Sequence, residues 1–267
     1  MLTVSHLDEK TLINKINTLF EYRLFPLLFS LKRSEVGVET SILNQQLVEL
    51  QKRIYYLDAH LEANLKPDAE MLNYLWEQIY NQCRDLGIMN EDLKSYTNHI
   101  HKYQKHELEL RDNKLPLRFK MEYFYFYKSC DVKLIRRIIY EQLRLSRDLG
   151  ALSYWRYYDL ITEVNDDVED VFEDLQFFNG NRFLISLIQK GSDYTYRIFE
   201  DFIRYIDKCN KNLTADHTFY DLRLLIQNET SKRIEETLKL LNIRKKEITE
   251  DTLFESVLLS HQLLKNI

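Results

Sequence analysis

Glycine and proline are scarce in this sequence of 267 residues, which contains five glycines and three prolines. Folds rich in β-strands and loops need both residue types at their turns. The scarcity therefore argues against a β-rich fold and favours helices. Because 45% of the residues are hydrophobic, the chain can bury a large core. We expect a single all-α domain over residues 1–267, built as one bundle of about ten helices.

Paired cysteines, long apolar runs and net positive charge are also missing. The three cysteines form no CxxC motif, so we expect free, buried thiols in a reducing cytosol, at Cys83, Cys130 and Cys209. No apolar run reaches the roughly eighteen residues of a membrane-spanning helix, and we expect a soluble, cytoplasmic protein with no transmembrane segment. The net charge of −5 gives no general attraction to nucleic acid.

One stretch lacks basic residues altogether. Residues 159–174, DLITEVNDDVEDVFED, include eight Asp or Glu and no Lys or Arg. On a helix, apolar side chains gather on one side and five of the acids fall in a stripe on the other. The stripe consists of Asp159, Glu163, Asp166, Asp170 and Glu173. Like charges at this spacing destabilise a helix, so we expect something to compensate them.

Two interpretations of the acidic stretch stay open at this point. The first is a solvated outer face, although such faces usually mix acids with lysines. The second is a carboxylate cluster for a hard divalent cation, with Mg²⁺ as the first choice. The run Asp166-Asp167-Val168-Glu169-Asp170 has the form DDxxD. Asp166 and Asp170 lie one turn apart and can face the same ion.

Helical periodicity and the few chain breakers divide the sequence into helix-sized segments. Pro26 should break the first segment, and Gly87 should end the third. The predicted helices are Leu7–Phe25, Glu39–Leu65, Pro67–Leu86, Glu91–Arg111, Phe119–Tyr127, Asp131–Leu149, Asp159–Asp174, Arg182–Lys190, Ser192–Lys208, Asp216–Leu241 and Glu250–Lys265.

Ring side chains are concentrated in two of these helices. His99, His101 and His106 have no pair at i,i+3 or i,i+4, so we interpret them as a polar helix face and not as a metal site. The segment Phe119–Tyr127 reads FKMEYFYFY. Its rings are either core residues or the wall of a pocket that stabilises a cation. The candidate pocket residues are Tyr123, Phe126, Tyr127 and Trp155.

The predicted helix before the acidic one carries mostly basic polar residues: Lys133, Arg136, Arg137, Arg144 and Arg147. With a hinge at Gly150, the two helices would pack antiparallel. The basic residues could then form ion pairs with the acids or bind an anion such as a diphosphate. The two roles are compatible with each other.

The segment Tyr158–Gly191 resembles the second aspartate-rich region of the class I isoprenoid (terpenoid) synthases. This α-helical family includes trans-prenyltransferases, terpene cyclases and squalene and phytoene synthases. Asp166, Asp167 and Asp170 match the DDxxD motif of many trans-prenyltransferases. The pattern after the motif, a loop with glycine and a basic residue and then an apolar segment ending in Lys-Gly, is matched by Gly180, Arg182, Lys190 and Gly191.

The resemblance implies an enzyme that holds Mg²⁺ around an allylic prenyl diphosphate and ionises it into an aromatic-lined cavity. The implied metal ligands are Asp166, Asp167, Asp170, Glu173 and Asp174, with Asp58 and Glu62 as the candidate first motif on a facing helix. The implied diphosphate ligands are Arg136, Arg137, Arg182 and Lys190. A homodimer is a further expectation.

Two features depart from this family. The sequence has no Gly-Lys-Arg element near its start and no Arg-Arg after the first motif, which favours a one-substrate terpene cyclase or a phytoene-type relative. Asp159 and Glu163 lie where the family has an apolar cavity wall. Three explanations are open: the cavity is unusual, Asp167 and not Asp166 points inward, or the protein is a non-catalytic descendant.

Other function classes compete with the enzyme. A non-catalytic helical interaction protein, or a degenerate synthase-like partner subunit, would use the acidic face to dock a basic surface. A di-iron carboxylate bundle needs Glu-x-x-His repeats, and no Glu in this chain has a His three residues later. Membrane-surface binding is the weakest candidate, because no segment combines a basic face with exposed aromatics at a terminus.

Overall fold

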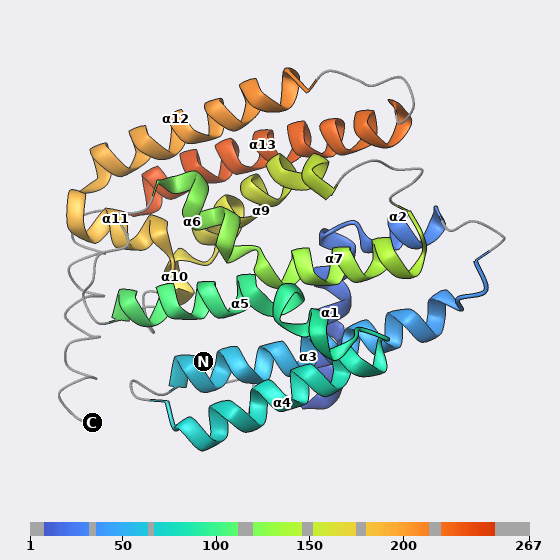
Figure 1. The fold of residues 1–267 in the computed structure, drawn as a ribbon. Coiled ribbons are helices and arrows are strands. Elements are labelled where there is room, and N and C mark those ends of the chain that lie inside the picture. Colours follow the sequence, from blue (N-terminus) through green and yellow to red (C-terminus); the bar gives the residue numbers. More distant parts are fainter. Residues whose placement is uncertain are drawn as a thin grey trace. The chain divides into compact units, whose positions relative to one another are not determined.

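The computed structural model describes residues 8–31, 36–63, 67–111, 120–145, 152–174, 180–213 and 220–248 (Figure 1). These residues form twelve α-helices and one short 3₁₀ helix, and no strand occurs among them. The predicted all-α class is confirmed. The chain divides into two compact units, residues 1–105 with 130–152 (unit 1) and residues 106–129 with 153–267 (unit 2). The expected single domain stays a prediction.

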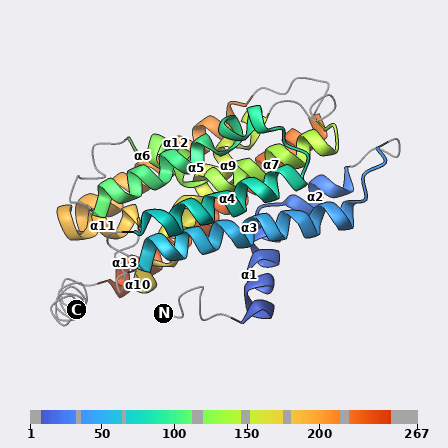
Figure 2. The same ribbon diagram turned by 60° about the horizontal axis from the view of Figure 1, so that its bottom comes forward.

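Unit 1 contains α1 (Glu9–Tyr22), α2 (Phe25–Ser30), α3 (Thr40–Ala63), α4 (Ala69–Asp85), most of α5 (Asn90–Arg111) and α7 (Cys130–Gln142). Helices α3 and α4 pack side by side, as Figures 1 and 2 show. The core residues of unit 1 have almost no exposed surface. They include Leu12 and Ile16 of α1, Leu47 and Leu57 of α3, and Ile79 of α4.

Pro26 and Gly87 interrupt the helices of unit 1 near the predicted positions. Pro26 lies in the first turn of α2, and the residue before that helix, Leu24, has a left-handed backbone with φ of 60°. The predicted break in the first helix is therefore confirmed. Gly87 follows α4 with φ of 80°, a conformation that favours glycine, and its N–H donates to the Arg84 carbonyl at 2.8 Å.

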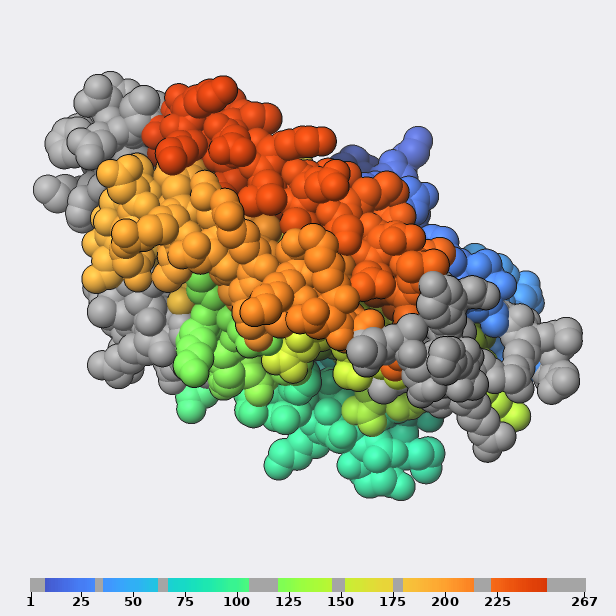
Figure 3. Space-filling view, turned by 90° about the horizontal axis from the view of Figure 1, so that it is seen from above, coloured from blue at the N-terminus to red at the C-terminus, as the bar shows by residue number. Residues whose placement is uncertain are grey.

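Unit 2 contains α6 (Met121–Lys128), most of the 3₁₀ helix η3 (Leu152–Trp155), α9 (Arg156–Glu169), α10 (Val171–Asp174), α11 (Arg182–Lys190), α12 (Ser192–Lys211) and α13 (Tyr220–Glu247). The aromatic run FKMEYFYFY forms a helix from Met121, as predicted. The space-filling view in Figure 3 shows α12 and α13 lying against each other along one face. The predicted helix Glu250–Lys265 lies outside the described residues.

Helix α9 is the central element of unit 2, and it packs against α6, α11, α12 and α13. Its predicted apolar side is confirmed, because Leu160, Ile161, Val164 and Val168 have no exposed surface. The acidic stretch is not one continuous helix. Helix α9 ends at Glu169, and the short α10 follows after Asp170.

Candidate metal and diphosphate site

The acidic residues of α9 and α10 differ in how far they are buried. Asp159 and Glu163 are 2% and 4% exposed, and Asp167 has no exposed surface. We call these three residues the inner row. Asp166 and Asp174 are partly buried and Asp170 is exposed, and we call these three the outer row. Position around the helix separates Asp166 from Asp167, which lie about 100° apart, whereas position along the helix separates Glu163 from Asp170.

Asp167 is the centre of a buried hydrogen-bond network. The hydroxyl of Tyr125 donates to its Oδ2 at 2.7 Å, and the backbone N–H of Arg182 donates to the same oxygen at 2.8 Å. The ammonium of Lys128 donates to its Oδ1. Both carboxylate oxygens are therefore bound to groups of the protein. Asp167 is therefore directed into the protein interior, and the three explanations that the sequence left open stay predictions.

Lys128 is a positive charge that compensates Asp167 in the inner row, and the sequence analysis missed it. Its ammonium forms an ion pair with Asp167, and 21% of its side chain is exposed. Burial alone would lower the pKa of Lys128, but the carboxylates of Asp167 and Glu163 raise it above its ordinary value. The available signal was its position, since it ends the aromatic helix α6 and is that helix's only cation.

The loop before α11 joins the two rows. Asn181 Nδ2 donates to the Asp167 carbonyl at 2.7 Å and to Asp174 Oδ2 at 2.8 Å, while its Oδ1 caps α11 by accepting from Leu184 N. Arg182 is 5% exposed and its guanidinium lies 5.4 Å from the Phe124 ring centre. Burial lowers the pKa of Arg182. This predicted diphosphate ligand therefore lies beside the motif.

The outer row is a stack of carboxylates one turn apart. The N–H of Asp170 donates to the Asp166 carbonyl at 2.9 Å, and the N–H of Asp174 donates to the Asp170 carbonyl at 2.8 Å. Helical spacing thus continues across the break between α9 and α10. Desolvation of its carboxylate, together with the charges of Asp166 and Asp174, raises the pKa of Asp170 to about 7. The predicted ligand Glu173 is exposed in α10.

We expect Asp170→Asn to stabilise the protein at about pH 8 and to leave its stability nearly unchanged at about pH 4. An acid whose pKa is raised on folding lowers stability progressively as pH rises from its unfolded pKa to its folded one. The full cost is present above about pH 7. Because Asp170 is exposed, solvent screening limits the gain to about 1 kcal/mol.

The test of this prediction is urea unfolding of wild type and Asp170→Asn across that pH range. A stability difference that does not change with pH would contradict the assigned shift.

The end of α9 is held by a residue that the sequence analysis did not single out. Arg244 of α13 donates to the carbonyls of Val168 and Glu169 at 3.1 and 2.8 Å. Its guanidinium also lies 4.8 Å from the Phe172 ring centre. A cation at a helix C-terminus satisfies free carbonyls and complements the helix dipole. Arg244 therefore stabilises the C-terminal end of α9, which lies between Asp167 and Asp170.

The remaining predicted site residues belong partly to unit 2 and partly to unit 1. Lys190 is exposed at the far end of α11 from Arg182, about 12 Å along the helix. Asp58, Arg136 and Arg137 belong to unit 1. Asp58 is partly buried, and the side chain of Glu62 lies outside the described residues. The expected pairing of the two acidic motifs stays a prediction.

The basic residues of α7 have contacts within unit 1. Arg136 is 1% exposed, and its guanidinium lies 5.7 Å from the Phe25 ring centre. Arg137 stacks on Tyr96 at 3.6 Å and pairs with Glu141 at 3.0 Å. The helix ends at Gln142, earlier than predicted. Ion pairing between this helix and α9 stays a prediction, and the hinge at Gly150 lies outside the described residues.

The four predicted pocket aromatics have different environments. Trp155 is fully buried and packs edge-on against Tyr158 at 6.0 Å. Tyr123 is 40% exposed and contacts Tyr127 at 4.7 Å, while Phe126 packs against the core of unit 2. The core interpretation applies to other members of the run, since Phe124 and Tyr125 are buried. A role as pocket walls stays a prediction for the four.

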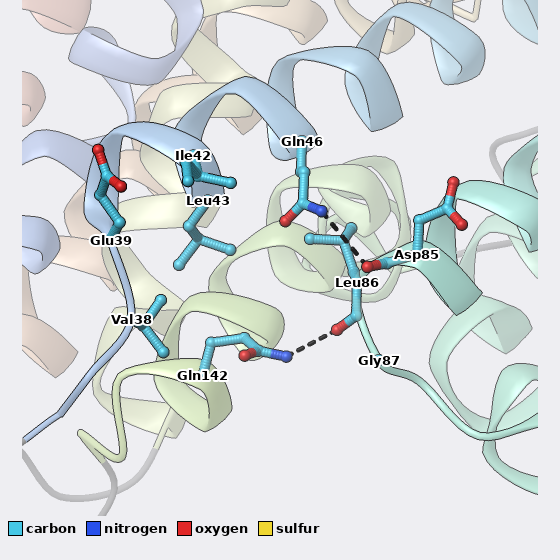
Figure 4. A pocket seen from close by; sticks show the side chains of 9 residues that line it. All are labelled: Val38, Glu39, Ile42, Leu43, Gln46, Asp85, Leu86, Gly87 and Gln142. Atoms are coloured by element: carbon cyan, nitrogen blue, oxygen red, sulfur yellow. Dashed lines mark hydrogen bonds between the residues drawn. The ribbon is translucent and has the colours of Figure 1, made fainter.

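Unit 1 has a pocket of its own, of about 270 Å³. Figure 4 shows Gln142 Nε2 donating to the Leu86 carbonyl at 2.6 Å and Gln46 Nε2 donating to the Asp85 carbonyl at 3.4 Å. These bonds hold the end of α4. The nine lining residues are Val38, Glu39, Ile42, Leu43, Gln46, Asp85, Leu86, Gly87 and Gln142. None of them is a predicted site residue.

The remaining cysteine and histidine predictions fall in both units. The three cysteines are free, with Cys83 and Cys130 buried and Cys209 partly buried. His101 stacks on Trp76 at 3.6 Å, and its Nε2 lies 2.9 Å from the Tyr80 hydroxyl. The side chain of His106 lies outside the described residues.

Within the ranges given above, no helix is both long and apolar enough to cross a membrane.

The carboxylates of the cluster meet the needs of Mg²⁺ only in part. Across the described part of the chain, no three His, Cys, Asp or Glu residues are arranged to hold a metal ion by themselves. Mg²⁺ is usually bound by one or two carboxylates together with water and phosphate oxygens. Asp166, Asp170 and Asp174 offer carboxylates on successive turns of the backbone. Asp167 does not fit, because its two oxygens are bound to protein donors.

Comparison with known proteins gives no relative for this chain: no family model matches it, and neither a curated protein nor a solved structure is significantly similar.

Proposed function

We propose that this protein is a Mg²⁺-dependent enzyme that ionises an allylic prenyl diphosphate, as a terpene synthase or a phytoene- or squalene-type relative does. The observation that carries the proposal is the outer row. Three carboxylates stand one turn apart, and their mutual repulsion contributes to the raised pKa of Asp170. A divalent cation relieves this repulsion, and hard oxygen ligands suit Mg²⁺.

Asp166 and Asp170 would hold the ion, with Asp174 beside them. When bound, Mg²⁺ supplies positive charge that stabilises a departing diphosphate. Arg182 is the predicted diphosphate ligand beside the motif, since its own backbone N–H binds Asp167. A buried guanidinium presents two parallel donors to phosphate oxygens. The all-helical architecture is compatible with such an enzyme, although fold alone does not establish activity.

The test is release of pyrophosphate from farnesyl or geranylgeranyl diphosphate with and without Mg²⁺. We expect Mg²⁺-dependent release that Asp166→Asn/Asp170→Asn abolishes. Asp201→Asn, at an exposed acid on α12, is the matched control and should keep full activity. Absence of turnover with every prenyl diphosphate, together with no thermal shift from Mg²⁺ plus a diphosphate analogue, would overturn the proposal.

A second candidate function is supported by the ion pair between Asp167 and Lys128. Because one motif carboxylate is already neutralised inside the protein, the outer row could serve as a docking face for a basic partner, as in a helical interaction protein. Asp166→Asn/Asp170→Asn would then abolish capture of an arginine-rich peptide and leave any Mg²⁺ response unchanged.

Size-exclusion chromatography with light scattering would test the expected homodimer.

A further inference from the structure

Lys128 has an unusual place for a lysine, at the end of an aromatic helix and against a fully buried carboxylate. Its ammonium donates to Asp167 Oδ1, while Asp167 has no exposed surface. The lysine side chain is 21% exposed, so its position is accessible from solvent. The ammonium thus lies at the boundary between the buried inner row and the open outer row.

The charged and titratable groups around this ammonium are mostly anionic. Glu163 is 4% exposed, and its charge, like those of Asp167 and Asp174, favours the ammonium form. Lys128 in turn favours ionised Asp170. The other polar groups on the Asp167 carboxylate are the Tyr125 hydroxyl and the Arg182 N–H, which are both donors. One fixed cation therefore serves carboxylates of both rows.

We propose that Lys128 is a built-in cation that takes the place of a divalent ion at Asp167. The DDxxD motif is then divided into two parts. Asp167 is permanently neutralised by the ammonium, and only the outer row exchanges metal ions. Two cations on one carboxylate repel each other strongly in a poorly solvated site, so the ammonium excludes a metal ion from Asp167.

This inference rests on the proposed function only in naming the outer row as the place where Mg²⁺ binds. A purely structural ion pair explains the same contact but predicts a different response. If Lys128 only stabilises the fold, its removal costs stability that metal ions do not restore. If it stands in for a metal ion, its removal opens Asp167 to one, with Glu163 nearby as a second oxygen donor.

The first experiment measures Mn²⁺ binding by electron paramagnetic resonance, with Mn²⁺ as a probe for Mg²⁺. Asp170→Asn should weaken binding about tenfold or more. Asp167→Asn, the same change at a motif residue three positions earlier, should keep the wild-type Mn²⁺ stoichiometry and weaken binding by less than Asp170→Asn does. Equal weakening by both variants would overturn the inference.

The second experiment measures the thermal stability of Lys128→Met with and without Mn²⁺ or Mg²⁺. The variant should melt lower than wild type, and the metal should raise its melting temperature by more than it raises that of wild type. Lys128→Met/Asp167→Asn carries no charge at either position, so it should show no such additional rise and it controls for misfolding. A metal response in Lys128→Met no larger than in wild type would contradict the proposal.

The two proposals fail in distinguishable ways. If no prenyl diphosphate is turned over but Lys128→Met gains a metal response, the enzymatic function is wrong and the role of Lys128 stands. If turnover is observed but Asp167→Asn loses Mn²⁺ as strongly as Asp170→Asn does, the enzyme stands and the ammonium does not replace a metal ion.

Discussion

Asp167→Ala is expected to lower the free energy of unfolding by about 3–5 kcal/mol, because removing one partner of a buried ion pair leaves the other charge uncompensated. Besides Lys128, the variant leaves two donors without their acceptor, the Tyr125 hydroxyl and the Arg182 N–H. The neighbouring motif residue gives the matched control. Asp166 is only partly buried, and Asp166→Ala should change stability by less than about 1 kcal/mol.

Urea unfolding of both variants can be followed in unit 2 alone. The two tryptophans are Trp76 in unit 1 and Trp155 in unit 2, so Trp76→Phe leaves Trp155 as the only indole. The midpoint should shift for Asp167→Ala with little change in slope. Equal losses for Asp166→Ala and Asp167→Ala would mean that the inner and outer rows are not distinct.

Trp155→Ala is expected to cost about 3–5 kcal/mol, the range for removing a large aromatic side chain from a packed core. Trp155 has no exposed surface, and the helix that carries the acids begins at the next residue. Its loss would leave a cavity at the start of α9. Tyr123→Ala is the control, because this aromatic residue, also a predicted pocket wall, is 40% exposed. It should cost less than about 1 kcal/mol.

Circular dichroism at the helix band is suitable for this pair, since it does not depend on the indole that one variant lacks. A loss below about 1 kcal/mol for Trp155→Ala would indicate that the ring borders open space, because truncation there creates no new cavity. That outcome would favour the original expectation of a pocket wall at this position.

The helices of this protein were predictable because their signals are local. Pro26 cannot continue a helix, and Gly87 adopts a backbone conformation with φ of 80° that other residues avoid. The aromatic run of α6 could be assigned to a helix since a lone strand would have lacked a partner. The apolar side of α9 followed from its period alone. Breaks without such signals, at Asp170 and after Gln142, were missed.

The division of the acidic stretch could not be predicted in this way. Asp166 and Asp167 are adjacent and chemically identical in sequence, yet Asp167 is completely buried and Asp166 is not. Their difference depends on α6, which brings Lys128 and Tyr125 to one of them from about forty positions earlier in the chain. No local pattern links those residues to the motif.

The amino-acid sequence by itself determined the helical class, the two-sided character of α9 and the excess of negative charge along it, because composition, periodicity and chain breakers act over one or two turns. Only the tertiary structure decided which acids are compensated. Packing of α6 and the start of α11 against α9 encloses Asp167 with an ammonium, a hydroxyl and a backbone N–H, whereas Asp170 lies past the end of α9 and stays exposed. A buried charge requires partners and an exposed one does not. Burial therefore separates Asp167, which is bound to protein groups, from Asp170, which is exposed.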